Sequence, residues 1–201
     1  MMHNLGMDIS KSFSAIVIGT SAGGLHALIH VLGELTVDYQ LPIVVVQHRG
    51  KEYKDLLEDV LQSKCLLKVK QADEKERINP SCIYIAPTNY HLLIEQDKTF
   101  SLTSDLYVKH SRPSIDLLFT KAAEVYKEEL IGIILTGASS DGAEGALDIK
   151  SEGGYTIAQN PDSAEYPYMP QASISIGAIN TILTLDEIKS FLMQSYERRE
   201  S

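Results

Sequence analysis

The sequence predicts an α/β fold with an open, mainly parallel sheet and one inserted antiparallel hairpin. Three apolar runs rich in Ile, Val and Leu, at 14–18, 41–48 and 130–137, indicate buried strands. Segments with apolar residues at helical spacing follow these strands, which is the rhythm of a parallel sheet covered by helices. The 201 residues are enough for one domain with a continuous core, and they contain no internal repeat or low-complexity linker.

The first half of the chain alternates strands with helices. A helix over 25–32 follows the first strand, and the second strand opens near Pro42, where a missing N–H is tolerated. The segment 53–63 again gathers its apolar residues on one helical face. We expect a half-exposed strand at 66–70, because polar and apolar residues alternate there, and a further strand at 83–87 after a charged loop.

In the second half of the chain, a predicted hairpin first interrupts the alternation of strands and helices. Strand patterns at 91–95 and 99–103 flank the turn 96–98 and predict a hairpin inserted in the α/β series. Ser114 is a good N-cap for a helix over 115–127. The remaining expected elements are a strand at 130–137, a helix at 143–152, a strand at 155–159, a loop at 160–170, a strand at 181–184 and a helix at 186–196.

Composition and charge exclude several classes of function. A net charge of −9 and a pI near 5.1 disfavour a nucleic-acid partner, which would require a basic face. The apolar runs are too short to insert into a membrane, and residues 1–12 lack the apolar core of a signal peptide, so we expect a cytoplasmic protein. Cys65 and Cys82 have no ligand partners at metal-binding spacing, so we expect two core thiols, with neither a metal nor a cofactor.

The turn after the first strand contains Gly19-Thr20-Ser21-Ala22-Gly23, which fits the Gly-x-Ser-x-Gly nucleophile elbow. In such an elbow the turn lifts the hydroxyl above the sheet, and the following helix N-terminus faces developing negative charge. Glycine-rich turns also hold phosphates in dinucleotide-binding folds, although this spacing matches neither nucleotide fingerprint. The turn by itself leaves a nucleophile and a structural or anion-binding turn equally open.

Ser21, His48 and Asp141 each lie just past the end of one of the three most apolar strands. In an open parallel sheet, reactive groups collect at the carboxyl ends of the strands, where the strand order reverses. A serine nucleophile needs a base near neutral pKa, and that base needs a carboxylate to fix its tautomer. The order Ser, His, Asp along the chain differs from that of the α/β-hydrolases, which disfavours a relative of that fold.

Other histidines compete for a role. His26 and His30 have the i, i+4 spacing of a metal pair, but no third ligand accompanies them, so a solvated helix face is the favoured interpretation. His91 opens a hairpin strand and His110 precedes Ser111-Arg112-Pro113, so either is a candidate for the edge of the site. Asp116 and Glu144 fit ordinary surface or capping groups on helices.

An ordered set of motifs is more specific than any of these residues alone. The set comprises Gly19-Thr20-Ser21-Ala22-Gly23-Gly24, Gln47-His48, Tyr84-Ile85-Ala86-Pro87, Arg112-Pro113-Ser114-Ile115-Asp116, Leu135-Thr136-Gly137 with Asp141-Gly142, and Ala158-Gln159-Asn160 followed by Met169-Pro170. Together these motifs resemble the catalytic domain of the chemotaxis protein-glutamate methylesterases (the CheB family). The resemblance covers a domain at 13–196, between an N-terminal extension at 1–12 and a C-terminal tail at 197–201.

The resemblance implies a three-layer α/β/α domain with a doubly wound sheet. It implies hydrolysis of glutamate γ-methyl esters on the cytoplasmic domains of methylated chemoreceptors, and deamidation of receptor glutamines. It also implies a catalytic triad of Ser21, His48 and Asp141. Further residues are candidates for the oxyanion hole or for substrate contacts, namely Thr20, Ala22, Ala138, Arg112 and Met169.

Two departures from the family pattern affect these expectations. Family members usually carry an N-terminal receiver domain, and nothing before Phe13 could encode one, so we expect constitutive activity, with a receiver or methyltransferase acting in trans as a candidate partner. The family commonly has a methionine where this sequence has Ala138, although a backbone N–H donor survives that change.

A non-catalytic signalling or scaffold module is the alternative function. Residues 166–169 suit a covering flap and a docking surface equally.

Overall fold

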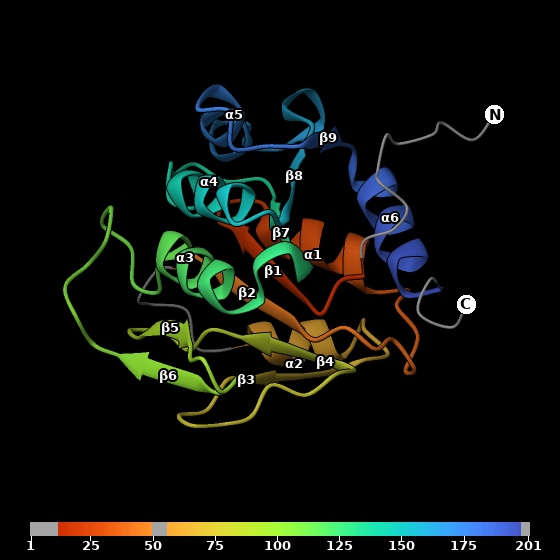
Figure 1. The fold of residues 1–201 in the computed structure, drawn as a ribbon. Coiled ribbons are helices and arrows are strands. Elements are labelled where there is room, and N and C mark those ends of the chain that lie inside the picture. The colour runs from red at the N-terminus through yellow and green to blue at the C-terminus, as the bar shows by residue number, and fades with distance from the viewer. Residues whose placement is uncertain (1–11, 50–55, 198–201) are drawn as a thin grey trace.

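A computed structural model describes residues 12–49 and 56–197, and in these residues the main sheet has seven strands in the order β3-β4-β2-β1-β7-β8-β9 (Figure 1). All of its strand pairs are parallel. The strands are β1 (Ala15–Thr20), β2 (Ile43–Gln47), β3 (Lys68–Gln71), β4 (Cys82–Ile85), β7 (Leu130–Ile134), β8 (Tyr155–Gln159) and β9 (Thr181–Leu183). The helices are α1 (Gly24–Leu32), α2 (Leu57–Gln62), α3 (Ile115–Tyr126), α4 (Ala143–Ser151), α5 (Tyr168–Ser175) and α6 (Leu185–Glu197).

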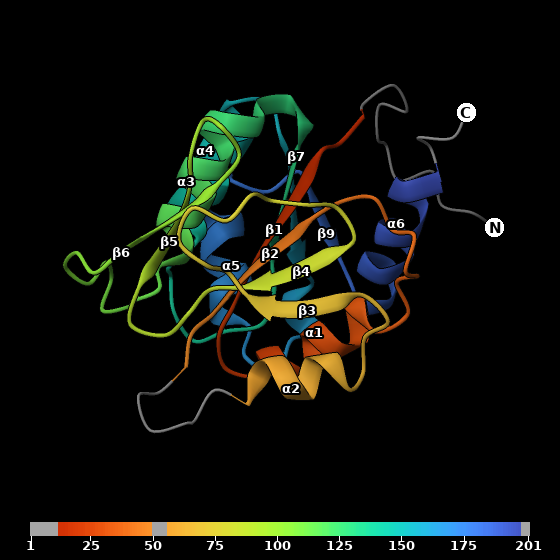
Figure 2. The same cartoon turned by 90° about the horizontal axis from the view of Figure 1, so that it is seen from below.

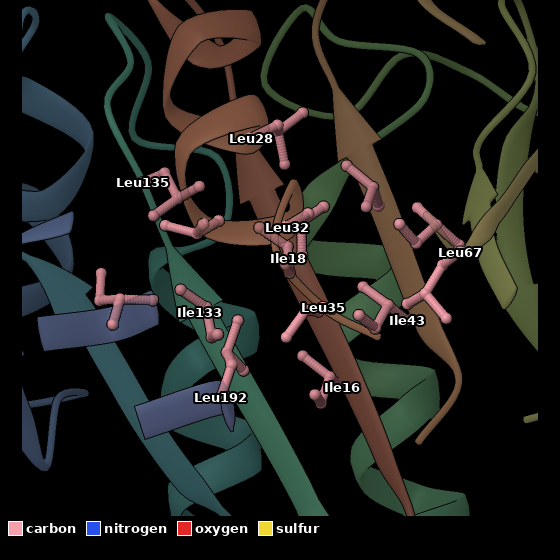
Figure 3. Packing of buried hydrophobic residues seen from close by; sticks show 14 of the residues in the cluster. Ile16, Ile18, Leu28, Leu32, Leu35, Ile43, Leu67, Ile133, Leu135 and Leu192 are labelled. Carbon is pink, nitrogen blue, oxygen red and sulfur yellow. The ribbon is translucent and has the colours of Figure 1, made fainter. Parts of the chain in front are cut away.

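Helices cover both faces of the sheet, as the three-layer expectation requires (Figure 2). Every residue of β1 is buried, because alternate side chains enter two different hydrophobic clusters. Ile16 and Ile18 pack with α1 and α6, where Figure 3 shows them beside Leu28 and Leu192. On the opposite face of the sheet, the second cluster is formed with α3, α4 and α5. The buried runs therefore reflect a sheet that is solvated on neither face.

The predicted hairpin is confirmed. Strands β5 (His91–Ile94) and β6 (Phe100–Thr103) form a separate antiparallel pair beside the main sheet (Figure 1). The Phe100 ring packs edge-on against Tyr84 of β4, with the ring centroids 4.9 Å apart. This contact joins the hairpin to the core below α3.

One expected loop is partly helical. The loop predicted at 160–170 contains a 3₁₀ turn at Pro161–Ser163 and the first residues of α5. Pro170 lies in the first turn of α5, where a missing N–H costs nothing because no intrahelical partner exists there. A second 3₁₀ turn, Lys127–Glu129, ends α3. The helix expected at 53–63 is described only from Leu57, since 50–55 lie outside the described residues, as do 1–11 of the predicted extension and 198–201 of the tail.

The strand order reverses between β1 and β7. From β1 the chain builds β2, β4 and β3 on one side, and β7, β8 and β9 follow on the other. The carboxyl ends of β1, β2 and β7 therefore lie together at the crevice where ligands bind in open α/β sheets. None of the helices in the described part of the chain is long and apolar enough to cross a bilayer.

Candidate active site

Ser21 lies in a tightly fixed turn between β1 and α1. Its N–H donates to the carbonyl of Thr136 at 3.1 Å, and its own carbonyl accepts from Gly24 N–H at 3.0 Å. The buried Thr20 hydroxyl donates to the same Thr136 carbonyl at 2.8 Å. Gly23 has a φ of +76°, a left-handed conformation that favours glycine, and it is the last residue before α1. The turn thus holds Ser21 at the N-terminus of a helix, above the end of the sheet.

Close packing against α3 explains the glycine before the serine. A Cβ on Gly19 would lie 2.4 Å from Cγ2 of Ile115, so no side chain fits there unless Ile115, the first residue of α3, moves. The first glycine of the motif thus serves helix–strand packing, and the second serves the turn.

His48 follows β2 and extends its pairing with β1, because its N–H donates to the carbonyl of Thr20 at 3.0 Å. The imidazole is 14% exposed, and its Nε2 lies 2.8 Å from Oδ2 of Asp141, whose side chain is fully buried. An ionised carboxylate can only accept a hydrogen bond, so Nε2 carries the proton and donates a hydrogen bond to Asp141. In the neutral ring, Nδ1 is then unprotonated and is the nitrogen able to act as a base.

Asp141 is held by donors from the start of α3. Its Oδ1 accepts from the Ser114 hydroxyl at 2.9 Å and from Asp116 N–H at 3.0 Å, and its Oδ2 accepts from Ile115 N–H at 2.7 Å. Burial by itself would raise the pKa of Asp141, but the hydrogen bonds from His48 and from these amides outweigh it and lower the pKa. The carboxylate stays ionised in a dry place and can support an imidazolium.

Asp116 performs the reciprocal task for α4. Its Oδ1 accepts from the N–H groups of Gly142 and Gly145, each at 2.8 Å, at the N-terminal end of α4. Burial and the nearby charge of Asp141 raise the pKa of Asp116, against the lowering by the Gly145 amide and Lys109. The two helices pack side by side (Figure 1). Asp141, just before α4, accepts from amides at the start of α3, and Asp116 of α3 accepts from amides at the start of α4, so the turn that carries Asp141 is fixed. Asp116 is therefore a buried cap, whereas Glu144 is exposed.

A polar cavity of about 380 Å³ opens at this edge of the sheet. Ser21 and His48 both line it, from β1 and β2 respectively. The other lining residues are Gln47, Arg49, Thr88, Asn89, Tyr107, His110, Ser111, Arg112 and Pro113. A second groove, of about 710 Å³, reaches Ser21 and His48 from the side of α1 and α2 and includes Ala22. Ser21 is therefore open to solvent from two sides.

Arg112 and the other expected substrate-contact residues occupy different positions around the site. The Arg112 guanidinium donates to the carbonyls of Ser104 and Asp105 at 2.6 and 3.0 Å and lies over the Tyr107 ring, so it holds the loop at the cavity rim. Ala138 lines a small apolar groove of about 310 Å³ with Tyr166, Pro167, Tyr168 and Gln171.

The segment that follows β8 is tied to the end of β7. Met169 is fully buried, and its N–H donates to the carbonyl of Gly137 at 3.0 Å. Gly137 N–H in turn donates to the carbonyl of Tyr166 at 2.9 Å. Tyr166 and Tyr168 are exposed, at 42% and 60%. The segment therefore combines a fixed backbone with exposed aromatic rings, of which Tyr166 lines the same groove as Ser21.

The remaining histidines and cysteines take separate places. His110 lines the cavity, whereas His91 is buried, with Nδ1 accepting from Ser114 N–H and Nε2 donating to the carbonyl of Leu106, each at 3.1 Å. His30 is exposed and pairs with Asp186 at 2.7 Å. No cluster of three potential metal ligands occurs among the described residues. The two cysteines are buried thiols, and burial raises the pKa of each.

Sequence reasoning placed Ser21, His48 and Asp141 at one edge of the sheet, and the structure brings these three residues together there. It did not single out Ser111, whose hydroxyl lies 3.5 Å from Nδ1 of His48. Asn89 and Tyr107 were missed as well. Nothing in their local sequence marks these residues, because the contacts join segments far apart in the chain.

Comparison with known proteins connects this geometry to a family. The family model described as CheB methylesterase matches residues 16–192. A crystal structure of the Thermotoga maritima CheB methylesterase catalytic domain superposes with a TM-score of 0.86 at 34% identity, over 92% of this chain and 99% of that one.

Two relatives extend the comparison. A protein of Leptospira interrogans, whose name gives it as a candidate protein-glutamate methylesterase/protein-glutamine glutaminase, is 45% identical over 91% of this chain and 95% of its own length. The protein-glutamate methylesterase/protein-glutamine glutaminase 1 of Carboxydothermus hydrogenoformans is 38% identical over 86% of this chain, which spans about half, 52%, of that relative. The chain therefore belongs to the CheB methylesterase family, a family of carboxylic ester hydrolases.

Proposed function

We propose that this chain hydrolyses glutamate γ-methyl esters on the cytoplasmic domains of methylated chemoreceptors, through Ser21, His48 and Asp141. One observation carries the proposal: His48, whose Nε2 lies 2.8 Å from the buried Asp141, lines the same cavity as Ser21. The names of the relatives support the substrate class. Because the proposed substrate is a cytoplasmic receptor domain, we propose that the protein acts in the cytoplasm.

Acylation begins when Nδ1 of His48 takes the proton of the Ser21 hydroxyl as its oxygen attacks the ester carbonyl carbon. Asp141 stabilises the imidazolium through Nε2. The tetrahedral intermediate then expels methoxide, which leaves as methanol with the proton from Nδ1. A glutamyl ester on Ser21 remains. Hydrolysis of that ester by water, with His48 again as base, releases the glutamate and restores the serine.

The start of α1 is suited to hold the negative oxygen of the intermediate. Ala22 follows the nucleophile, and its N–H lies in the turn that enters α1, where the helix dipole favours negative charge. Because the Ser21 amide donates to Thr136, we assign the oxyanion to Ala22 N–H and to Ala138 N–H, which follows Gly137, a residue packed against Ser21. In this account Thr20 and Met169 hold the two turns, and Arg112 shapes the rim that the receptor meets.

The same machinery accounts for deamidation of glutamine. A γ-amide offers the same carbonyl carbon to Ser21, and the leaving group takes the Nδ1 proton and departs as ammonia rather than methanol. Both activities should therefore share one nucleophile and one acyl-enzyme. A scaffold role would not require a serine, an imidazole and a buried carboxylate at one site, so the arrangement favours the hydrolase.

The experiment compares the parent chain with Ser21→Ala, using membranes that carry methylated receptors. We expect methanol release by the parent, and a loss of about 10⁴-fold to 10⁶-fold in the variant. Ammonia release from receptor glutamines should fall in parallel. Receptor binding without methanol release by the parent would support the scaffold alternative instead.

A further inference from the structure

The segment before α3 presents a second hydroxyl to the base. Val108 and Ser111 exchange both of their backbone hydrogen bonds, at 3.1 and 2.7 Å, around Lys109 and His110. These two central residues have φ values of 45° and 65°, the left-handed pair found in two-residue hairpin turns. The turn places Oγ of Ser111 3.5 Å from Nδ1 of His48, on the lining of the same cavity as Ser21.

Ion pairs fix this turn to the same helix ends that hold Asp141. Nζ of Lys109 lies 2.7 Å from Oδ2 of Asp116 and 3.4 Å from Oε1 of Glu144. Asp116 in turn caps the N-terminal end of α4. The turn that carries Ser111 is therefore tied by Lys109 to residues at the N-terminal ends of α3 and α4.

The direction of the contact follows from the pair on the far side of the ring. Because Nε2 donates to Asp141, Nδ1 of the neutral imidazole is an acceptor, and the Ser111 hydroxyl faces it as a donor. When Nδ1 gains a proton, the same hydroxyl oxygen can accept. A distance of 3.5 Å is long for a hydroxyl hydrogen bond, so Nδ1 is not locked to Ser111 and can exchange protons with a third group.

We propose that Ser111 is a further catalytic residue, which holds the hydrolytic water against Nδ1 of His48 during deacylation. The inference rests on the proposed function, because it needs the glutamyl ester on Ser21. The water oxygen attacks the ester carbonyl carbon and gives one proton to Nδ1, while its second hydrogen bonds to Oγ of Ser111. The bond from the carbonyl carbon to Oγ of Ser21 then breaks, Nδ1 returns the proton to that oxygen, and the glutamic acid side chain leaves.

The two half-reactions need Ser111 to different degrees. In acylation the nucleophile is Ser21, which the turn between β1 and α1 already positions. In deacylation the nucleophile is a free water molecule, which has to be ordered by hydrogen bonds before it can react. Loss of the Ser111 hydroxyl should therefore slow deacylation by about 10-fold to 100-fold, the effect of one hydrogen bond to a group that develops charge, and leave acylation close to the parent rate.

The acyl-enzyme can be detected directly, because its acyl group is a glutamyl side chain of the receptor. The deacylation intermediate is a covalent conjugate of enzyme and receptor, which acid quenching preserves and a denaturing gel resolves. We would follow the conjugate and methanol release on the millisecond to second scale with methylated receptor membranes, in the parent, Ser111→Ala and Ser111→Thr. Ser190→Ala, a serine of α6 whose hydroxyl donates to the carbonyl of Asp186 away from the site, is the matched control.

Ser111→Ala should give a burst of methanol, a slower steady rate and a conjugate that outlasts that of the parent. Ser111→Thr, which keeps the hydroxyl, should shorten the conjugate lifetime relative to Ser111→Ala, and Ser190→Ala should behave as the parent does. The proposal is overturned if Ser111→Ala slows the burst as much as the steady rate, or if it leaves the conjugate lifetime unchanged. Failure of the proposed function would differ from both outcomes. In that case the parent would form no conjugate, or Ser21→Ala would still form one.

Discussion

Replacing Asp141 with asparagine changes one carboxylate oxygen into an NH₂ group, and the structure shows what that group would meet. The Oδ2 position accepts from His48 Nε2–H and Ile115 N–H, and the Oδ1 position accepts from the Ser114 hydroxyl and Asp116 N–H. Either orientation of the amide sets its N–H groups against two donors. If the NH₂ group faces His48, the imidazole must turn Nε2 into an acceptor, so the proton moves to Nδ1 and the base is lost.

Two magnitudes follow from this arrangement. Each buried donor left without its acceptor costs about 1–3 kcal/mol, so Asp141→Asn should lower the free energy of unfolding by about 2–6 kcal/mol. Loss of the repulsion between Asp141 and Asp116 offsets part of this cost. Methanol release should fall by about 10⁴-fold, because the wrong tautomer faces Ser21.

Urea unfolding and methanol release measure the two effects on the same protein sample. Asp148→Asn is the matched control, since Asp148 lies on the exposed face of α4 and accepts from the Thr120 hydroxyl. It should change the free energy of unfolding by less than about 1 kcal/mol and leave turnover at the parent level. If Asp141→Asn kept parental stability and turnover, the carboxylate would support neither the base nor the α3 N-terminus.

Four other perturbations test separate parts of the account. His48→Gln should remove turnover because Ser21 loses its base, and methanol release by this variant at the parent rate would exclude His48 from that role. The folded-state pKa of Asp141 lies below its unfolded value, so its stabilisation is present above about pH 4 and is lost as the pH falls through the folded value; the difference in unfolding free energy between parent and Asp141→Asn should shrink in acid. Gly19→Ala should destabilise the fold by about 1–3 kcal/mol, since the new Cβ would lie 2.4 Å from Ile115, and unchanged urea unfolding would refute that packing. The isolated chain should release methanol without a phosphodonor, because Ser21 lines open cavities; activity that depends on a phosphorylated partner would contradict this.

Periodicity was enough to predict the parallel sheet. The run at β1 is apolar throughout because Ile16 and Ile18 enter one hydrophobic cluster while Ala15 and Val17 enter the other, and this burial on both faces is visible in sequence as an unbroken apolar stretch. The Ser114 N-cap was predicted on the same local grounds and is confirmed, since its side chain accepts from Leu117 N–H. Local patterns suffice where an element's environment is uniform along its length.

Helix α5 escaped prediction because its local signals point to a loop. Pro170 and the mixed polar and apolar residues after it form no continuous apolar stripe, and the helix is held by Met169, which fills the space beside Gly137. A partner distant in the chain thus decides the conformation. For the same reason, neither the contact of Ser111 with His48 nor the capping of α3 by Asp141 and of α4 by Asp116 was predicted. Each contact joins residues that are far apart in the chain.

Three residues of the site followed from the sheet rule alone. Ser21, His48 and Asp141 each follow a buried strand, and parallel strands that flank a reversal of order must deliver such residues to one crevice. The rim could not be deduced in this way, because it is built from the segment between β6 and α3, whose path depends on the contacts of Arg112 and Lys109.

The most direct measurement is to locate the acyl group during turnover. The parent chain is mixed with methylated receptor, quenched in acid, digested and analysed by mass spectrometry. We expect a receptor glutamyl ester on the peptide that contains Ser21, formed together with methanol release. An ester on the peptide that contains Ser111, or methanol release with no ester on the enzyme at any time, would contradict it.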